Sequence, residues 1–572
     1  MRRVPKMFRV FELSAFLFFL DFIAGIMNTI RERVVDERAM HVTSVFQKTG
    51  DHAVLDHDAD SDEEVLLALG YKQEFKRDFS IWTSFAVSFS VLGLLPSVAS
   101  TLSYNLAYSG PAGSVWGWFV ACIPIQFIAL SMAELCSSMP TAGGLYYASA
   151  VLAPAGWGPL CSWITGWSNF TGWATAPCAI NYALASMVLT AAEIGHPTYV
   201  AQTYQVYLMM LALLFIEGLL TMNSTKFLAW MNSVGTVVNV FVVFIFVIWM
   251  PVGSINGPKT NPNNIVWTSD GIVNGTEWPT GFAFMMGMLS VIVTIAGFDA
   301  PFHLSEECSN ANIASPRAIL MTAQLGMYMG WAIIIAVAYT VKDITDVVSG
   351  QYGQPMGSLC LQVLGPKAGL AMFALNIFAQ CIVASSRVTF SFSRDDALPF
   401  SRYLKRVNTY TKTPVNAVWF IVLIASLVGL LIFASPVAIG AVFSIAAIAQ
   451  YVAFGLPICL KLFVVGDKFR PGPWNLGRFS KPIGIIAVAW IVLIIPILCF
   501  PAVKGKDLNK LNMNYASLVY GGVMLLAMTW YAVDARKWFK GPKINVEHLI
   551  GGRVLVGEGS GSEVREVVVG KK

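Results

Sequence analysis

The stretch TGFAFMMGMLSVIVTIAGFDAPFHLSEECS, residues 280–309, is apolar enough to enter a membrane but is interrupted past its middle by Gly297, Asp299, Pro301 and His303. Glycine permits unusual backbone angles, aspartate caps helix starts, and proline fits a first helical turn, where no backbone donor is missed. A carboxylate at membrane depth is costly unless it faces protein or water. The stretch therefore predicts two half-helices separated by a functional interruption.

An earlier apolar run, SIWTSFAVSFSVLGLLPSVASTLS at residues 80–103, carries a similar interruption. Gly93 and Pro96 lie near its middle, and Pro96 is again placed to open a second half-helix. Interrupted spans at corresponding places in two halves of a chain indicate the substrate site of a transporter. A second hypothesis stays open, because glycine and proline also kink packed membrane helices that bind nothing.

The composition places the whole chain in a membrane. Of 572 residues, 56% are hydrophobic and only 12% are charged, and the net charge of +5 implies no nucleic-acid partner. The nine cysteines form no C-x-x-C pair, and five of the six histidines lie outside the apolar runs, so neither a metal site nor a cofactor is expected. Enzyme motifs such as G-x-S-x-G and H-E-x-x-H are missing, so we expect no enzyme.

Apolar runs long enough to cross a bilayer need about 20 residues. By this criterion the sequence predicts an all-α protein with twelve transmembrane helices within residues 80–533, at roughly 80–103, 115–136, 158–190, 204–222, 228–250, 280–303, 318–341, 366–390, 415–434, 437–463, 483–501 and 514–533.

The two ends of the chain are predicted to lie in the cytoplasm. Residues 1–79 are polar and acidic and read as largely disordered, whereas the apolar segment 8–30 within them fits an interfacial helix, a signal sequence, an extra span or an artefact of the gene model. The tail 534–572 follows the last span. Lys and Arg concentrate in segments that this topology places inside, namely 72–77, 394–412, 468–481 and 536–543, so we reject a thirteenth span at 8–30.

Glycosylation of an asparagine in the loop 251–279 would support the same topology. Asn274 begins the sequon Asn-Gly-Thr, which the predicted arrangement places outside the cell. We therefore expect Asn274 to be a glycosylation site.

Several motifs together resemble the amino acid, polyamine and organocation transporter superfamily, and within it the fungal amino acid, choline and GABA permeases. The resemblance covers about residues 70–540. The motifs are GYKQEFKRDFSIWTSFAVSFSVLGLLPS at 70–97, SMAELCSSMPTAGGLYYASAVLAP at 131–154, GFDAPFHLSEEC at 297–308, PRAI at 316–319 and SRVTFSFSRDDALPFS at 386–401.

The resemblance implies the leucine-transporter-like fold, with two inverted five-helix repeats at 80–250 and 280–463 and two peripheral helices at 483–533. It also implies a secondary carrier, usually driven by proton symport. The plasma membrane is the expected location and the vacuolar membrane is the alternative.

The interruptions supply the candidate substrate-binding residues. Backbone N–H groups at a helix start attract a carboxylate, and carbonyls that end the upstream half attract an amine. The ring of Phe298 is placed to close over the substrate, and Asp299 either attracts an ammonium group or only caps the restarting helix. The candidates are Gly93, Leu94, Leu95, Pro96, Ser97, Ala296, Gly297, Phe298 and Asp299.

Five ionisable residues are candidates for proton coupling or gating, because histidine titrates near neutrality and buried carboxyl groups titrate toward it. They are His303, Glu306, Glu307, Glu134 and Glu217. Glu306 and Glu307 also fit a solvated helix end. Glu134 and Glu217 also fit structural pairs, with Arg387 as a partner for one of them or as a simple cytoplasmic anchor.

The substrate class stays open. The Trp-rich third span, with Trp157, Trp163, Trp167 and Trp173, fits either a packed scaffold or an aromatic wall for a quaternary ammonium. We expect a proton-coupled permease for a small amino acid or GABA. Choline or another cationic amine or polyamine is the alternative, and a substrate-sensing receptor without net flux is the alternative from a different class.

Overall fold

The computed structural model describes residues 66, 77, 79–196, 198–223, 225–254, 260–379, 398, 401–404, 406, 408, 414–505, 507–509, 512–542, 554–555 and 566–567. The segment 8–30 and Arg387 lie outside the described residues. The described helices are α4 (Ile81–Leu92), α5 (Leu94–Ser138), α6 (Gly144–Leu152), α7 (Gly158–Gly195), α8 (Thr203–Thr221), α9 (Thr225–Val252), α10 (Asn263–Trp267), α11 (Thr280–Gly287), α12 (Leu289–Ile295), α13 (Ala300–His303), α14 (Ala311–Thr340), α15 (Ile344–Ser349), α16 (Pro355–Phe378), α18 (Ser401–Leu404), α19 (Val415–Gly429), α20 (Pro436–Cys459), α21 (Ser480–Leu498), α22 (Ala516–Trp530) and α23 (Arg536–Trp538).

Shorter elements complete the described chain. Single helical turns are η1 (Ser269–Gly271), η2 (Ser305–Glu307), η3 (Leu430–Phe433), η4 (Leu460–Val465), η5 (Gly466–Lys468), η6 (Gly477–Phe479) and η7 (Tyr531–Ala535). The strands β1 (Val554–Leu555) and β2 (Glu566–Val567) pair antiparallel, with Val554 opposite Val567.

Within the described residues, eleven helical runs are long and apolar enough to cross a membrane. The first run, Ile81–Ser138, has 58 residues, which at about 1.5 Å per residue is far longer than a hydrocarbon core of about 30 Å. Gly110 interrupts it with φ 68° and ψ −175°, so this run covers the first two predicted spans. The all-α membrane fold is thus confirmed, whereas the inverted repeat stays a prediction.

The predicted start of the eighth span, residue 366, agrees with the structure, and its predicted end, residue 390, lies outside the described residues. Helix α16 itself begins earlier, at Pro355. The side chain of Gln354 accepts a hydrogen bond from the Gly357 N–H, and a proline at the first helical position needs no such acceptor. Gly365, at φ 77° and ψ −179°, then joins two helical pieces, so the apolar run after Pro366 is only the second piece.

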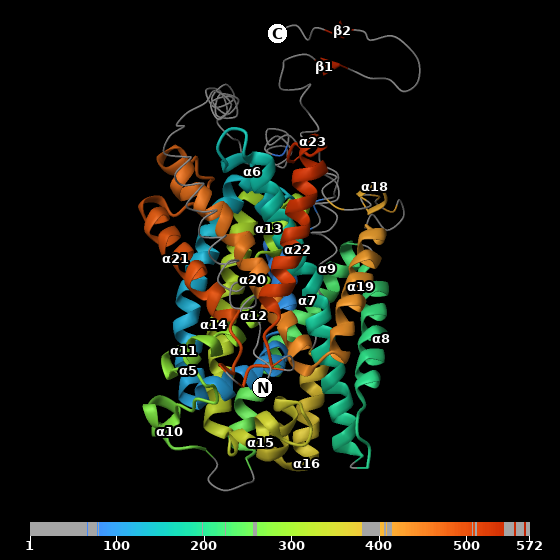
Figure 1. Cartoon of the computed structure of the whole chain (residues 1–572), viewed down its shortest axis with the longest axis vertical. Coiled ribbons are helices and arrows are strands. Elements are labelled where there is room, and N and C mark those ends of the chain that lie inside the picture. The colour runs from blue at the N-terminus through green and yellow to red at the C-terminus, as the bar shows by residue number, and fades with distance from the viewer. Residues whose placement is uncertain are drawn as a thin grey trace.

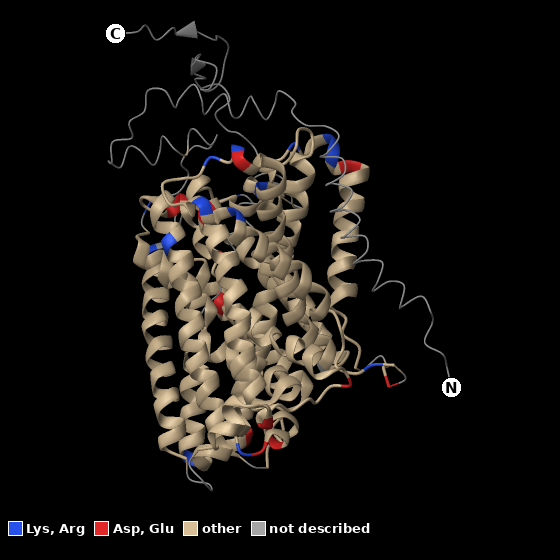
Figure 2. Cartoon of the chain, turned by 90° about the vertical axis from the view of Figure 1, so that its left-hand side faces the viewer, with Lys and Arg blue, Asp and Glu red and all other residues tan. Residues whose placement is uncertain are grey.

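The helices stand side by side in one bundle (Figure 1), with α8 and α19 along one side and α7, α12 and α20 near the centre. Figure 2 shows Lys, Arg, Asp and Glu gathered at the two ends, with very few between them. Leu208, Phe215 and Phe241 on α8 and α9 are exposed, as expected for a lipid-facing surface.

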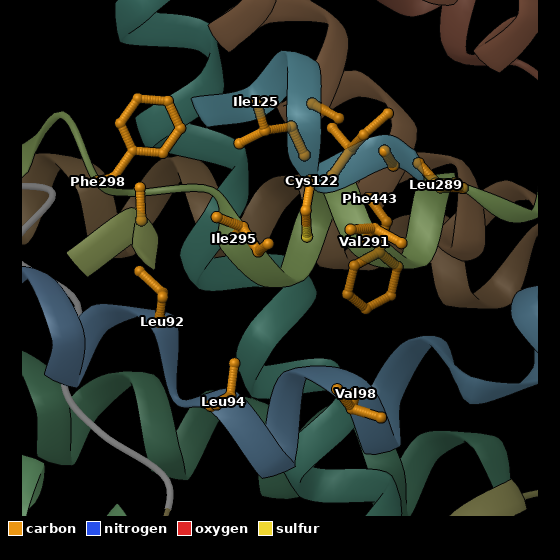
Figure 3. Close-up of a cluster of buried hydrophobic side chains, with 14 of the residues drawn as sticks. Leu92, Leu94, Val98, Cys122, Ile125, Leu289, Val291, Ile295, Phe298 and Phe443 are labelled. Atoms are coloured by element: carbon orange, nitrogen blue, oxygen red, sulfur yellow. The ribbon is translucent and has the colours of Figure 1, made fainter. Parts of the chain in front are cut away.

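The centre of the bundle joins the regions around the two predicted interruptions. Leu92 and Leu94 flank the first, and they belong to the same buried apolar cluster as Ile295 and Phe298, which flank the second (Figure 3). The two spans are also paired where the first begins and the second ends. Phe79 N donates to Glu307 O over 3.0 Å, and Ser309 N donates to Phe79 O over 2.9 Å.

Candidate substrate site between two interrupted spans

The first predicted interruption is present at Gly93, between α4 and α5. Gly93 has φ 45° and ψ 57°, a left-handed conformation that glycine adopts without steric cost. Its N–H donates to Ser90 O over 3.1 Å, and its carbonyl accepts from Ser97 N over 2.8 Å. Pro96 lies in the first turn of α5, so its missing N–H leaves no helical bond unmade.

The start of α5 leaves backbone donors available at this interruption. No side chain caps the helix at Gly93. First-turn N–H groups, here those of Leu94 and Leu95, have no acceptor within their own helix. Ser97 Oγ instead donates to the carbonyl of Leu92 over 2.5 Å, which satisfies the end of α4. The positive end of a helix dipole thus lies at the interruption.

The second interruption separates α12 from α13. Ala296 is extended, with φ −62° and ψ 148°, and Gly297 has φ 97°. The chain then forms one helical turn, Ala300–His303, with Pro301 in it. Asp299 precedes this turn, but its side chain makes no capping bond. The hypothesis that Asp299 only caps the restarting helix is therefore wrong.

The two interruptions lie against each other. Ser88 Oγ, on α4, donates to the carbonyl of Gly297 over 3.1 Å. A Cβ at Gly297 would lie 2.9 Å from Val91 Cγ1, so the approach of the two spans requires glycine. Further along, the hydroxyl groups of Thr101 and Ser290 are 2.8 Å apart. Residues 209 and 189 positions apart in the sequence are thus in direct contact.

Asp299 is fully buried at this site with 0% of its surface exposed. Its Oδ2 accepts a hydrogen bond from Trp173 Nε1 over 3.3 Å and lies 3.6 Å from His303 Nε2. Its Oδ1 has no hydrogen-bond partner among the described residues. A buried acceptor without a donor is costly, and an ammonium group of a bound ligand would satisfy it.

His303 links Asp299 to the segment before α6. Its Nδ1 lies 3.4 Å from the carbonyl of Ala142, and its Nε2 lies 3.0 Å from Asn169 Nδ2. A carbonyl only accepts, so Nδ1 carries a hydrogen, and Nε2 of the neutral ring accepts from Asn169. Ala142 N in turn donates to Glu306 Oε1 over 2.9 Å.

Glu306 and Glu307 do not form a solvated helix end. Only 1% and 3% of their surfaces are exposed. They follow His303 directly, in η2, and Glu306 binds the N–H of Ala142, whose carbonyl faces His303.

The other two predicted carboxylates lie elsewhere. Glu134 forms a buried ion pair with Lys461, and it also accepts from Leu476 N and Ser480 Oγ. The sequence analysis missed Lys461, although a lysine within the apolar run 437–463 was a usable signal. Glu217 Oε2 accepts from Asn181 Nδ2 over 2.7 Å.

Two tryptophans of α7, Trp163 and Trp173, make different kinds of contact. Trp163 packs against Trp530, Tyr531 and Phe539 and donates to Ala527 O, so it is part of the scaffold. Trp173 instead donates to Asp299. The sequence analysis did not assign this contact, nor the contact of Asn169 with His303, because no local pattern marks a residue that reaches another span.

Two further predictions concern groups away from the interruptions. Asn274 lies in a turn, where its Nδ2 donates to Trp278 O over 2.7 Å, and its glycosylation stays a prediction. In the part of the chain that the structure describes, no three His, Cys, Asp or Glu side chains are grouped to hold a metal ion.

Comparison with known proteins identifies the family of this chain. A family model described as amino acid permease matches residues 79–524. An uncharacterized amino-acid permease of Schizosaccharomyces pombe is 46% identical, covering 88% of this chain and 94% of its own length. A putative polyamine transporter of Candida albicans is 38% identical, covering 93% and 98%. An amino-acid permease of Arabidopsis thaliana is 32% identical, covering 85% and 97%. The interrupted apolar spans and these matches agree, and the chain belongs to the amino acid permease family.

Proposed function

We propose that this permease imports a small amino acid or GABA by proton symport, through alternating access around the two interrupted spans. The observation that carries this proposal is the carboxylate of Asp299, which is buried between the interruptions and has one oxygen without a donor among the described residues. A substrate ammonium group supplies that donor, and a charge-assisted hydrogen bond to a carboxylate is among the stronger polar contacts.

The opposite end of the substrate meets the start of α5. The uncapped N–H groups of Leu94 and Leu95 and the dipole of α5 favour a carboxylate there. Phe298, whose ring packs 5.4 Å from that of Phe454, provides an apolar wall. The proposed substrate-binding residues are therefore the segments Gly93–Ser97 and Ala296–Asp299.

A cationic amine or polyamine is the second candidate substrate. Two observations favour it: the free acceptor at Asp299 and the Candida albicans relative named a putative polyamine transporter. Choline is a weaker member of this class, because Trp173 is the one tryptophan of α7 that bonds to Asp299, and a quaternary ammonium is held best by several rings.

We assign the coupling proton to the ionisable residues that follow Asp299 in α13 and η2. Glu134 is already paired with Lys461, and Glu217 is bonded to Asn181. This leaves His303, Glu306 and Glu307 as the proposed proton-coupling residues. With both termini in the cytoplasm, these residues lie on the cytoplasmic side of the substrate, in the plasma membrane or, as the alternative, the vacuolar membrane.

Uptake into transporter-deficient cells tests the proposal. Labelled GABA, alanine, putrescine and choline are supplied singly, with and without a protonophore. We expect uptake of GABA or alanine that the protonophore abolishes. Preferential uptake of putrescine selects the second candidate. Uptake that is insensitive to the protonophore contradicts proton symport, and binding of a probe without uptake identifies a receptor instead of a carrier.

A further inference from the structure

The surroundings of His303 suit two protonation states of its ring. Nδ1 faces the carbonyl of Ala142, which only accepts, so Nδ1 is protonated in both states. Nε2 faces two groups, Asn169 Nδ2 at 3.0 Å and Asp299 Oδ2 at 3.6 Å. The neutral ring accepts from the amide of Asn169, whereas the charged ring presents an N–H to the carboxylate of Asp299.

Asn169 has an unused acceptor that matches the charged ring. Its Oδ1 is buried and has no hydrogen-bond partner among the described residues, while its Nδ2 points to Nε2. A rotation of this amide by about 180° exchanges Nδ2 for Oδ1, and Oδ1 then accepts from a protonated Nε2. One side chain thus serves both forms of the imidazole without any movement of the backbone.

Several elements bring titratable side chains toward His303. Elements α4, α6, α14 and η2 pack against α13, and α7 reaches His303 through Asn169. Helix α4 brings no titratable side chain, and the arginine that α14 brings, Arg317, is exposed. The titratable or charged side chains on the other elements and before α13 are Asp299, Tyr146, Tyr147, Glu306, Glu307, Arg317, Tyr328, Tyr339, Cys161, Cys178, Tyr182 and Glu193. Asp299 lies within ion-pair distance of the ring, with Oδ2 3.6 Å from Nε2.

We propose that His303 is the residue that binds the transported proton and that Asn169 is a positioning residue that turns its amide to hold either form of the ring. This inference rests on the proposed function, of which it names the proton site. The proton comes from one side of the membrane, bonds to the Nε2 lone pair, and leaves from the same atom on the other side. The substrate then binds Oδ1 of Asp299, and the protonated Nε2 of His303 faces Oδ2 of the same carboxylate. Because both positive groups use one carboxylate, binding of the substrate is coupled to binding of the proton.

A titration of the purified full chain by histidine NMR tests the inference without knowledge of the substrate. The variant His303→Gln assigns the signal among the six histidines. We expect Asn169→Asp to raise the pH at which His303 is half protonated by about one unit or more, since a carboxylate close to an imidazole favours its charged form. The control Asp467→Asn removes an exposed carboxylate near Lys481 and is expected to leave that midpoint unchanged.

Transport by proteoliposomes gives the second readout, with labelled GABA and putrescine as probes and a trapped pH dye. We expect His303→Gln to lose proton entry and gradient-driven accumulation, because glutamine binds no proton, whereas the control Asp467→Asn should retain both. Asn169→Asp should shift the pH profile of uptake upward, in step with the NMR midpoint.

The outcomes separate this inference from the proposed function. Wild-type liposomes that move neither probe contradict the proposed substrates, and the NMR titration still decides on His303 and Asn169. Proton entry at the wild-type ratio in His303→Gln overturns the proton site. An unchanged midpoint in Asn169→Asp overturns the positioning role.

Discussion

Ser88 Oγ donates a hydrogen bond to the carbonyl of Gly297 over 3.1 Å and so joins the two interrupted spans beside the second interruption. We expect Ser88→Ala to destabilise the protein by about 1 kcal/mol, the usual worth of one hydrogen bond, and to reduce uptake. Apparent melting temperature and initial uptake rate measure the two effects. Ser100→Ala, which removes a bond only to Ser97 O within α5, is the matched control, and equal effects of both variants contradict the prediction.

Asp299→Asn should impair substrate binding more than folding. The amide can still accept from Trp173 Nε1 but loses the charge that attracts an ammonium group. Hydrogen bonds to charged groups are worth about 1.5–3 kcal/mol, so we expect KM to rise about 10- to 100-fold. Uptake kinetics and the amount of protein at the cell surface are measured together. An equal fall of uptake and surface abundance assigns Asp299 to folding.

Gly297→Ala should destabilise the contact between the two spans. The added Cβ would lie 2.9 Å from Val91 Cγ1, and φ 97° is strained for any side chain. Val91→Ala in the same protein removes the close contact but leaves the backbone strain. We therefore expect partial recovery of the apparent melting temperature in the double variant. Full recovery would show that backbone strain contributes nothing.

Glu134→Gln should destabilise the protein strongly, because it leaves the buried ammonium of Lys461 without its partner. Removing one member of a buried ion pair costs about 3–5 kcal/mol. The double variant Glu134→Gln with Lys461→Met should regain part of this stability, since no uncompensated charge remains. The exposed pair of Asp467 and Lys481 is the control, and Asp467→Asn should change stability by less than about 1 kcal/mol. Thermal unfolding in detergent compares the four proteins.

Local chemistry was sufficient to predict the interruptions. Gly93 and Gly297 each lie inside an apolar run, and both adopt positive φ in the structure. The spans themselves followed from run length, and the predicted start of the eighth span coincides with the break at Gly365 in α16. The burial of charged residues was harder to predict, because Glu306 and Glu307 fit a solvated helix end by their residue type and yet are buried.

Contacts between distant spans could not be predicted from local pattern. Glu134 and Lys461 are 327 positions apart, and Trp173 and Asp299 are 126 apart. Each residue alone fits several roles, since a tryptophan in a membrane helix is ordinary scaffold and a lysine near a span end is an ordinary anchor. The structure identifies the roles because it supplies the partner.

The segments 79–92 and 297–309 are joined to each other twice, through the backbone pairing of Phe79 with Glu307 and Ser309 and through the hydrogen bond of Ser88 to Gly297. Two attachments separated along each segment resist both hinging and sliding. We therefore expect these two segments to move as a single rigid piece. Under the proposed alternating access, we expect the passage to the cytoplasm to open between this piece and α6 and α7, where His303 makes its contacts with Ala142 and Asn169.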